Sequence, residues 1–170
     1  GATVMTNGFE NVTPRYNIPL GSYVSGWHVD AGSIDVLTTV ANNVVPDSGT
    51  NCIDINGTGA GTISTNLSLV VGHTYQVSFA YCRNPDGVQF NIVPQAAISV
   101  ATSNLLTVTP NWSNTWSNPL WQHTSVVFTA SSALSKLQVQ GLTSGGIGVM
   151  FDTFNVTDVM ALPLPQAPLV

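Results

Sequence analysis

The sequence predicts an all-β fold in which two antiparallel sheets form a β-sandwich. Apolar and polar residues alternate with a period of two, as in the segment TYQVSF, whose Tyr75, Val77 and Phe79 should share one face. Clusters of Gly, Pro, Asn and Ser separate such segments at the spacing typical of sandwiches, and no segment carries a convincing helical pattern. A chain of 170 residues fits one domain of this kind.

Strand patterns follow one another along most of the chain. In order they are SIDVL (33–37), NCIDIN (51–56), GTISTNL (61–67), TYQVSF (74–79), AAISV (96–100), LLTVT (105–109), TSVVFTA (124–130), SKLQVQGL (135–142) and VMFDTFNVTDV (149–159). We expect the domain to cover residues 1–158. Residues 159–170 include Pro163, Pro165 and Pro168, and since proline cannot donate to a sheet ladder, they should form an extended tail.

Composition and charge exclude several classes of protein. The net charge is −5, and Arg15, Arg83 and Lys136 are the only fixed cations, too few to neutralise a run of nucleic-acid phosphates. No apolar run approaches the roughly 20 residues of a transmembrane helix. Only 6% of the residues are charged, so copies of the chain should repel one another weakly and associate easily. The first residue, Gly1, suits a chain from which a secretory signal has been cleaved, and we expect a secreted protein.

The two cysteines lie on predicted strands with the same orientation. If Ile53 faces the core then Cys52 faces outward, and if Phe79 faces the core then Cys82 also faces outward. Were the two strands neighbours, a disulfide between Cys52 and Cys82 would be geometrically possible. We predict this disulfide; the alternative is two free, half-buried thiols.

Several segments resemble, in the same order, a known family of extracellular proteins. They are NGFE, GWHVDAGSIDVL, DSGTNCIDINGTGAGTISTNL, GHTYQVSFAYCRNPDG, WQHTSVVFTA and FDTFNV, and together they extend from Asn7 to about Val156. This order resembles the choice-of-anchor C family of secreted bacterial proteins, whose relatives include a plant cell-wall family. The resemblance implies a galactose-binding-like jelly roll, a location outside the cell and an affinity for polysaccharide. The segment NWSNTWSNP departs from the family pattern as a lengthened loop.

The resemblance also implies a candidate calcium site at the two ends of the fold. In sugar-binding modules that the chain resembles, an acidic pair and main-chain carbonyls often hold one structural Ca²⁺, whose preference for oxygen suits such ligands. Glu10, the only glutamate, ends the first strand, and Asp152 lies in the last one. These two residues are the predicted ligands; alternatively, both carboxylates only accept hydrogen bonds from turn amides.

Two tryptophans in the lengthened loop are candidate contacts for a ligand or partner. Trp112 and Trp116 lie in a polar segment, so we expect their indoles outside the core. An indole can stack on a pyranose ring, and the neighbouring Asn111 and Asn114 could bind hydroxyl groups. The same side chains could instead contact another protein chain or pack locally.

Further candidates have a stronger structural explanation. The segment RNPDG has turn chemistry, although Arg83 and Asp86 could also line the rim of a ligand groove. Trp27 and Trp121 match aromatic positions of the family pattern and are expected to pack in the core or at a sheet edge.

The sequence carries no pattern for catalysis. It has no nucleophile elbow and no close carboxylate pair, and His28, His73 and His123 are scattered over separate predicted strands or turns. We therefore expect a non-catalytic extracellular module, of cell-surface or matrix type, that binds carbohydrate. The alternative is a subunit that assembles with copies of itself into an extracellular filament, sheath or capsule.

Overall fold

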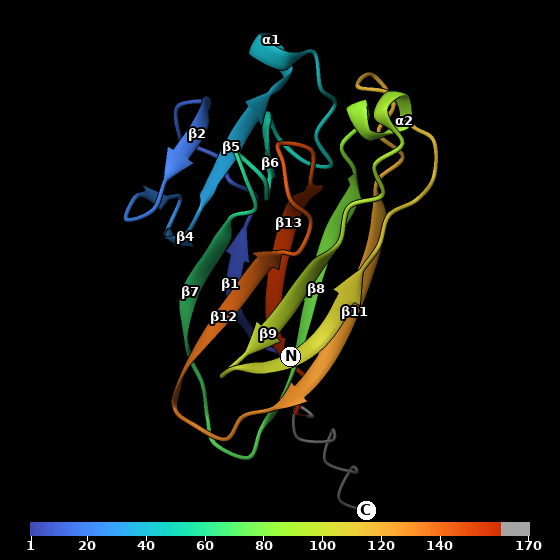
Figure 1. Cartoon of the computed structure of the whole chain (residues 1–170). Helices are drawn as coiled ribbons and strands as arrows, with labels where there is room; N and C mark the ends of the chain where they lie inside the picture. The colour runs from blue at the N-terminus through green and yellow to red at the C-terminus, as the bar shows by residue number, and fades with distance from the viewer. Residues whose placement is uncertain (161–170) are drawn as a thin grey trace, which may run out of the picture.

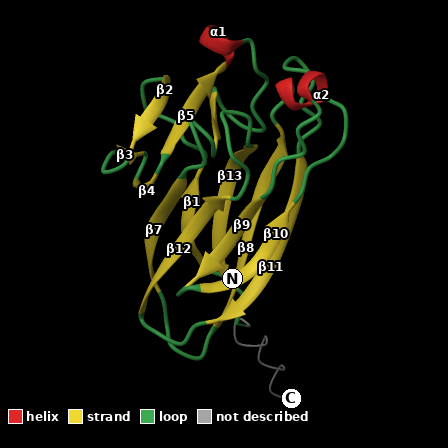
Figure 2. Ribbon diagram, viewed as in Figure 1, coloured by secondary structure: helices red, strands yellow, loops and turns green. Residues whose placement is uncertain are grey.

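Two antiparallel sheets pack face to face in the computed structural model, which describes residues 1–160 (Figures 1 and 2). The all-β fold and its sandwich of antiparallel sheets, predicted from the alternation, are confirmed. The predicted tail lies almost wholly outside the described residues, together with Pro163, Pro165 and Pro168. No helix within residues 1–160 has the length and hydropathy to span a membrane.

The first sheet has seven strands, in the order β11-β8-β13-β6-β5-β2, and β1 also pairs with β13. Its strands are β1 (Thr3–Asn7), β2 (Arg15–Pro19), β5 (Ser33–Thr38), β6 (Asn51–Asp54), β8 (Thr74–Arg83), β11 (Gln122–Thr129) and β13 (Val149–Asp158). The terminal strands β1 and β13 therefore meet, as expected for a jelly roll.

The second sheet has six strands, in the order β10-β9-β12-β7-β4-β3. Its strands are β3 (Tyr23–Val24), β4 (Trp27–Ala31), β7 (Thr62–Ser68), β9 (Ala96–Val100), β10 (Ser103–Val108) and β12 (Leu134–Gly141).

The sequence predicted no helix, but two single-turn helices lie at one end of the sandwich (Figure 1). These are α1 (Thr39–Asn42) and α2 (Asp86–Phe90). Each is followed by an asparagine in the left-handed conformation, Asn43 with φ 53° and Asn91 with φ 55°. Asparagine tolerates this conformation, which ends a helix. The helices were missed because one turn is too short to show a helical period.

The main core fills the space between the sheets with the inward side chains of both. Tyr75, Val77 and Phe79 of β8 are buried in it, as the alternation predicted. Trp27 has no exposed surface, so its predicted place in the core is confirmed, and its ring lies 5.2 Å from that of Phe154 on β13. Burying one such large side chain contributes about 1.5–3 kcal/mol to stability.

A second apolar cluster lies on the outer face of the seven-stranded sheet. Its buried members are Leu37, Val44, Cys52, Cys82 and Met150, and the half-buried indoles of Trp112, Trp116 and Trp121 pack against it. The loop of residues 109–121 thus covers part of a sheet face that would otherwise be exposed to solvent. The expectation for Trp112 and Trp116 is only half met: they lie outside the main core, but they contact this second cluster.

The predicted disulfide is wrong, since Cys52 and Cys82 are both free and buried. Their shared face was predicted correctly, but β13 lies between β6 and β8. Neighbouring strands are about 4.8 Å apart, so Cα atoms two strands apart exceed the roughly 7 Å limit for a disulfide. Burial raises the pKa of both thiols, and nearby carboxylates raise it further. A disulfide therefore gives no argument for an oxidising compartment.

Candidate functional site

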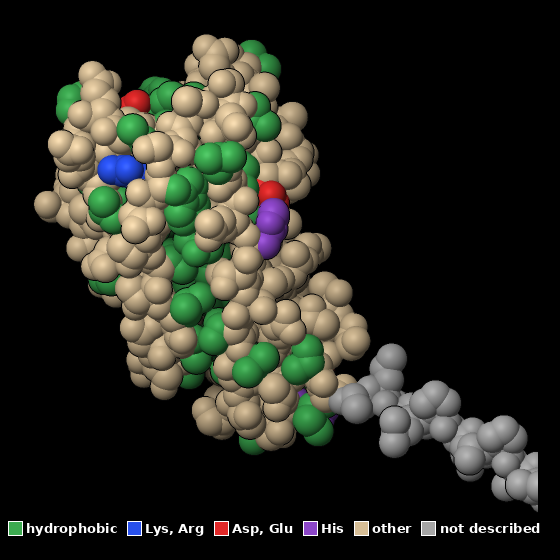
Figure 3. All heavy atoms as spheres, turned by 90° about the vertical axis from the view of Figure 1, so that its right-hand side faces the viewer, with side chains coloured by type: hydrophobic (Ala, Val, Ile, Leu, Met, Phe, Trp, Pro, Cys, Tyr) green, Lys and Arg blue, Asp and Glu red, His purple; other side chains and the backbone are tan. Residues whose placement is uncertain are grey.

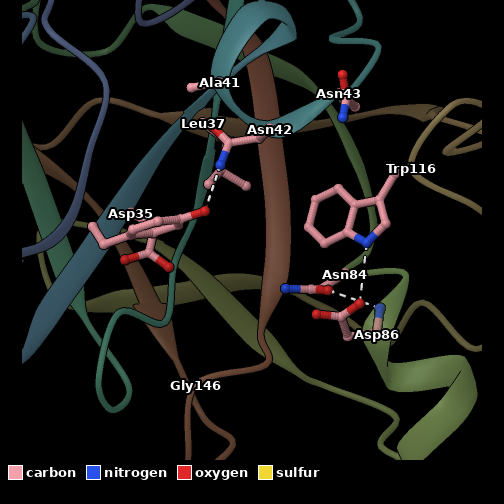
Figure 4. A pocket seen from close by; sticks show the side chains of 10 residues that line it. Asp35, Leu37, Ala41, Asn42, Asn43, Asn84, Asp86, Trp116 and Gly146 are labelled. Carbon is pink, nitrogen blue, oxygen red and sulfur yellow. Dashed lines mark hydrogen bonds between the residues drawn. The ribbon is translucent and has the colours of Figure 1, made fainter.

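A pocket of about 330 Å³ opens at the end of the sandwich that carries the two helices (Figure 4). Strands β2 and β5 and helix α1 form one side of it, while the start of α2 and the loop of residues 109–121 form the other. Side chains alternate along β5, so Ile34 and Val36 enter the core while Asp35 and Leu37 face the pocket. The pocket thus lies beside the second apolar cluster, to which Leu37 also belongs.

Two aromatic side chains form opposite walls of this pocket. Tyr16 projects from β2 with 61% of its surface exposed, and its hydroxyl accepts a hydrogen bond from Asn42 Nδ2 of α1. Trp116 comes from the loop on the other side, and its indole N–H donates to Asp86 Oδ1 over 3.0 Å (Figure 4). Each ring is therefore held by a hydrogen bond at its polar end, which leaves its apolar surface available to the pocket.

Two carboxylates lie between the aromatic walls. Asp35 Oδ1 accepts the main-chain N–H of Asn17 at 2.8 Å, and burial raises the pKa of Asp35 although this hydrogen bond lowers it. Asp86 uses Oδ1 for the Trp116 indole. Within residues 1–160, the other oxygen of each carboxylate accepts no hydrogen bond, so both can accept one from a ligand.

A buried network fixes the amide that lies between these carboxylates. Asn84 Nδ2 donates to Asp54 Oδ2 at 2.7 Å, and Asn84 Oδ1 accepts the main-chain N–H of Asp86 at 2.9 Å. Asp54 has no exposed surface and also accepts main-chain N–H groups of Asn56 and Gly148. Burial raises the pKa of Asp54 to about 7, in spite of these hydrogen bonds. The pocket floor is thus preorganised.

The structure brings only two of the predicted contact residues, Trp116 and Asp86, into this pocket. Arg83 is buried, and its guanidinium donates to the carbonyls of Ile92 at 2.8 Å and Gly87 at 2.7 Å, so it closes the turn around α2 and does not line a rim.

The other predicted contacts lie apart from the pocket. Asn114 is buried, and its Nδ2 donates to the carbonyls of Arg83 and Pro119, so its amide holds the loop together. Asn111 is exposed, and Trp112 packs on the second apolar cluster.

Sequence reasoning missed Tyr16, Asp35, Asn42 and Asn84. Asp35 carried the one usable signal, because it is the outward polar position of the SIDVL pattern. The others converge only because β2 pairs with β5 and the loop folds over β8, and no spacing in the chain encodes these pairings.

The predicted calcium ligands approach the same loop from two sides. Glu10 Oε1 accepts the main-chain N–H groups of Thr50 and Asn51, and Asp152 Oδ2 accepts that of Ser48. These contacts agree with the alternative of hydrogen bonding to turn amides. Burial, and then the charges of Asp47 and Glu10, raise the pKa of Asp152 to about 7, although hydrogen bonds to main-chain amides lower it.

A cation would offset this burial and repulsion, but the main-chain N–H groups of Ser48, Thr50 and Asn51 already donate to the two carboxylates. Within residues 1–160, no group of three or more His, Cys, Asp or Glu side chains could hold a metal, and the remaining ligands would be main-chain carbonyls. Calcium at Glu10 and Asp152 stays a prediction.

Calcium should raise the melting temperature, and a chelator should lower it, because a ligand that binds only the folded state stabilises it. Asp152→Asn should abolish the difference, whereas Asp158→Asn, at the end of the same strand, should keep it. Identical melting curves with calcium and with chelator, and no metal in undialysed protein, would contradict the prediction.

Comparison with known proteins supports the fold. No family model matches the chain, and no curated protein matches it by sequence, so the resemblance to the choice-of-anchor C family stays a prediction.

Several solved structures are similar over almost the whole chain. The CBM22-1 xylan-binding domain from Paenibacillus barcinonensis is 13% identical with a TM-score of 0.60, covering 95% of this chain and 97% of that one. TmCBM61, solved in complex with β-1,4-galactotriose, is 16% identical with a TM-score of 0.60 over 93% and 99% of the two chains. A family 35 carbohydrate-binding module from Clostridium thermocellum is 12% identical with a TM-score of 0.54 over 94% and 100%. The chain thus has the galactose-binding-like jelly-roll fold of carbohydrate-binding modules.

Proposed function

We propose that this protein is a non-catalytic glycan-binding module and that its binding site is the pocket between Tyr16 and Trp116. The observation that carries the proposal is the pairing of two aromatic walls with carboxylate and amide groups between them. The fold, similar to that of carbohydrate-binding modules, agrees with it.

The pocket chemistry matches the two kinds of surface that a sugar presents. The C–H groups on the face of a pyranose ring pack against aromatic side chains such as Tyr16 and Trp116. The hydroxyl groups at its edge can donate to Asp35 and Asp86 and can exchange hydrogen bonds with the side-chain amides of Asn42 and Asn43.

We further propose that the protein acts outside the cell, where structural polysaccharides are found. The low content of charged residues and the resemblance to a secreted family support this location.

Removing either aromatic wall should weaken glycan binding about 5-fold to 150-fold, since truncation of a central binding residue costs about 1–3 kcal/mol. Tyr16→Ala and Trp116→Ala would be compared with the parent on xylan and β-1,4-galactan by co-sedimentation and calorimetry. Phe90→Ala is the matched control, because Phe90 is 60% exposed and Tyr16 61%, but Phe90 lies outside the pocket.

Two results would contradict the proposal. If both pocket variants retain the parent's affinity for a glycan that it binds, the site lies elsewhere. If the parent releases reducing ends from the polysaccharide, the module is an enzyme, and Asp35 and Asp86 are the first carboxylates to test.

A further inference from the structure

Strand β11 forms one edge of the seven-stranded sheet, and it differs from every other edge strand of the described fold. It pairs with β8 over eight consecutive residues, Gln122–Thr129, without a bulge, and it contains no proline, lysine, arginine or carboxylate. Natural sheets usually protect their edges by such residues, by bulges or by very short strands.

The other edge strands carry such protection. β2 contains Arg15 and Pro19 and a register shift, and β3 has only two residues. β1 and β10 each have a register shift in their pairing. Only β11 offers a long, regular and uncharged edge among residues 1–160.

The free hydrogen-bonding groups of this edge can be assigned from its register. The main-chain N–H of Ala130 donates to the carbonyl of His73, on the side of β8. Since N–H directions alternate along a strand, those of His123, Ser125, Val127 and Thr129 point away from β8. No hydrogen bond within residues 1–160 uses these four N–H groups.

The sandwich is also open along this edge. Leu105 and Leu106 of β10, and Val126 and Phe128 of β11, pack against the main core but remain only partly buried. A hollow of about 100 Å³ lies between these strands and is lined by Val100, Leu105 and Phe128, among others. Figure 3, which faces this side of the molecule, shows hydrophobic side chains gathered in a band along it and few charged ones.

We propose that β11 is a self-association interface, at which a second copy of the chain adds its own β11 in antiparallel orientation. A two-fold axis at Val126 would bring Ser125 opposite Val127 and His123 opposite Thr129, so the free N–H groups of one copy meet free carbonyls of the other.

His123, the only titratable residue of the strand, lies 2.7 Å from Asp47 Oδ1 through its Nε2, so its charge has a partner within the same copy. In the proposed pairing His123 lies opposite the uncharged Thr129, so no like charges face each other across the axis. The half-buried Val126 and Phe128 of both copies would become covered. The Tyr16–Trp116 pocket involves no residue of β11, so a dimer would present two glycan sites.

The oligomeric state of the full chain tests the proposal. Sedimentation equilibrium should give twice the 17.8 kDa mass of the monomer. Val127→Pro should return it to the monomer mass, because proline removes an N–H that points to the edge and that β8 does not need. Val127→Ala is the control at the same position and should remain dimeric.

Val127→Lys is a second variant, in case proline impairs folding, because Val127 is 57% exposed and a lysine on an edge strand opposes pairing with another strand. Amide hydrogen exchange at His123, Ser125, Val127 and Thr129 should be slow in the dimer and fast after dilution. A monomeric parent chain, a Val127→Pro variant that stays dimeric, or a mass that keeps growing with concentration would each overturn the proposal. Because none of these readouts uses a glycan, the result is independent of the proposed function.

Discussion

The free energy of unfolding is expected to fall by about 3–4 kcal/mol as the pH rises from about 4 to about 7, because of Asp54 alone. Burial raises the pKa of this carboxyl from 3.8 to about 7 in the folded chain. A group whose pKa is raised on folding stabilises the folded state fully below its unfolded pKa. This contribution is lost as the pH rises through the folded pKa, and stability should level off above it.

The surroundings of Asp54 accommodate its protonated form. Asn56 Oδ1 is buried and accepts no hydrogen bond within residues 1–160. A Cβ placed on Gly148 would lie 2.5 Å from both this oxygen and Asp54 Oδ1, so the two oxygens flank the same glycine. Asn56 Oδ1 is thus an unpaired acceptor within about 5 Å of Asp54 Oδ1, and its partial negative charge disfavours the ionised carboxylate.

Urea unfolding measured from pH 4 to pH 8 checks this expectation. Asp54→Asn should remove about half of the fall, because its amide does not titrate, whereas Asp152, whose pKa is also raised to about 7, still does. Asp158→Asn is the control: Asp158 is half-buried at the end of β13, and its hydrogen bond with His73 lowers its pKa, so this variant should keep the fall between pH 4 and pH 7. Stability that stays constant or rises over this range in the parent would show that Asp54 remains ionised.

The alternation of side chains was enough to predict the sandwich, because one buried face per strand dictates a period of two. It placed the β8 side chains and the outward parity of both cysteines correctly. It could not predict which strands are neighbours, and so the disulfide failed: the order of strands depends on long-range pairing. The insertion of β13 between β6 and β8 joins residues about 70–100 positions apart, for which no local pattern exists.

The candidate site was less predictable than the fold, for a related reason. Two of the predicted residues line the pocket. Trp116 was predicted because it is a tryptophan in a polar loop, and Asp86 because it is an acidic residue in a turn. Arg83 and Asn114 also carry polar side chains that could bind a ligand. In the structure, however, these side chains donate to main-chain carbonyls that the turns leave unpaired. Whether a polar side chain binds a ligand or its own backbone depends on where the loop folds, and composition does not encode this.

Trp112→Ala is expected to lower the free energy of unfolding by about 2–4 kcal/mol, close to the cost of truncating a tryptophan in a core. Trp112 packs on the second apolar cluster, with its ring 5.7 Å from that of Tyr81 at 68°. Its loss would uncover a sheet face. Urea unfolding at one pH, compared with the parent chain, measures the effect.

Trp112→Phe is the matched variant. It keeps the aromatic contact with Tyr81 and removes a buried indole N–H that has no hydrogen-bond partner within residues 1–160. Leaving a buried donor unpaired is itself unfavourable, so this variant should retain most of the stability that alanine loses. Trp116→Ala should destabilise less than Trp112→Ala, and it should lose glycan affinity, because Trp116 lines the pocket and Trp112 does not.

The two tryptophans are thus expected to have separate roles, although they stand four positions apart in one loop. If Trp112→Ala leaves the unfolding midpoint unchanged and weakens glycan binding, then the loop does not serve as a cover for the second cluster. Trp112 would in that case be a ligand contact, as its polar surroundings in the sequence first indicated. In contrast, if Trp112→Ala loses stability but keeps its affinity for glycan, then Trp112 packs on the second cluster and takes no part in binding. Glycan binding would then depend on Trp116, on the wall opposite Tyr16.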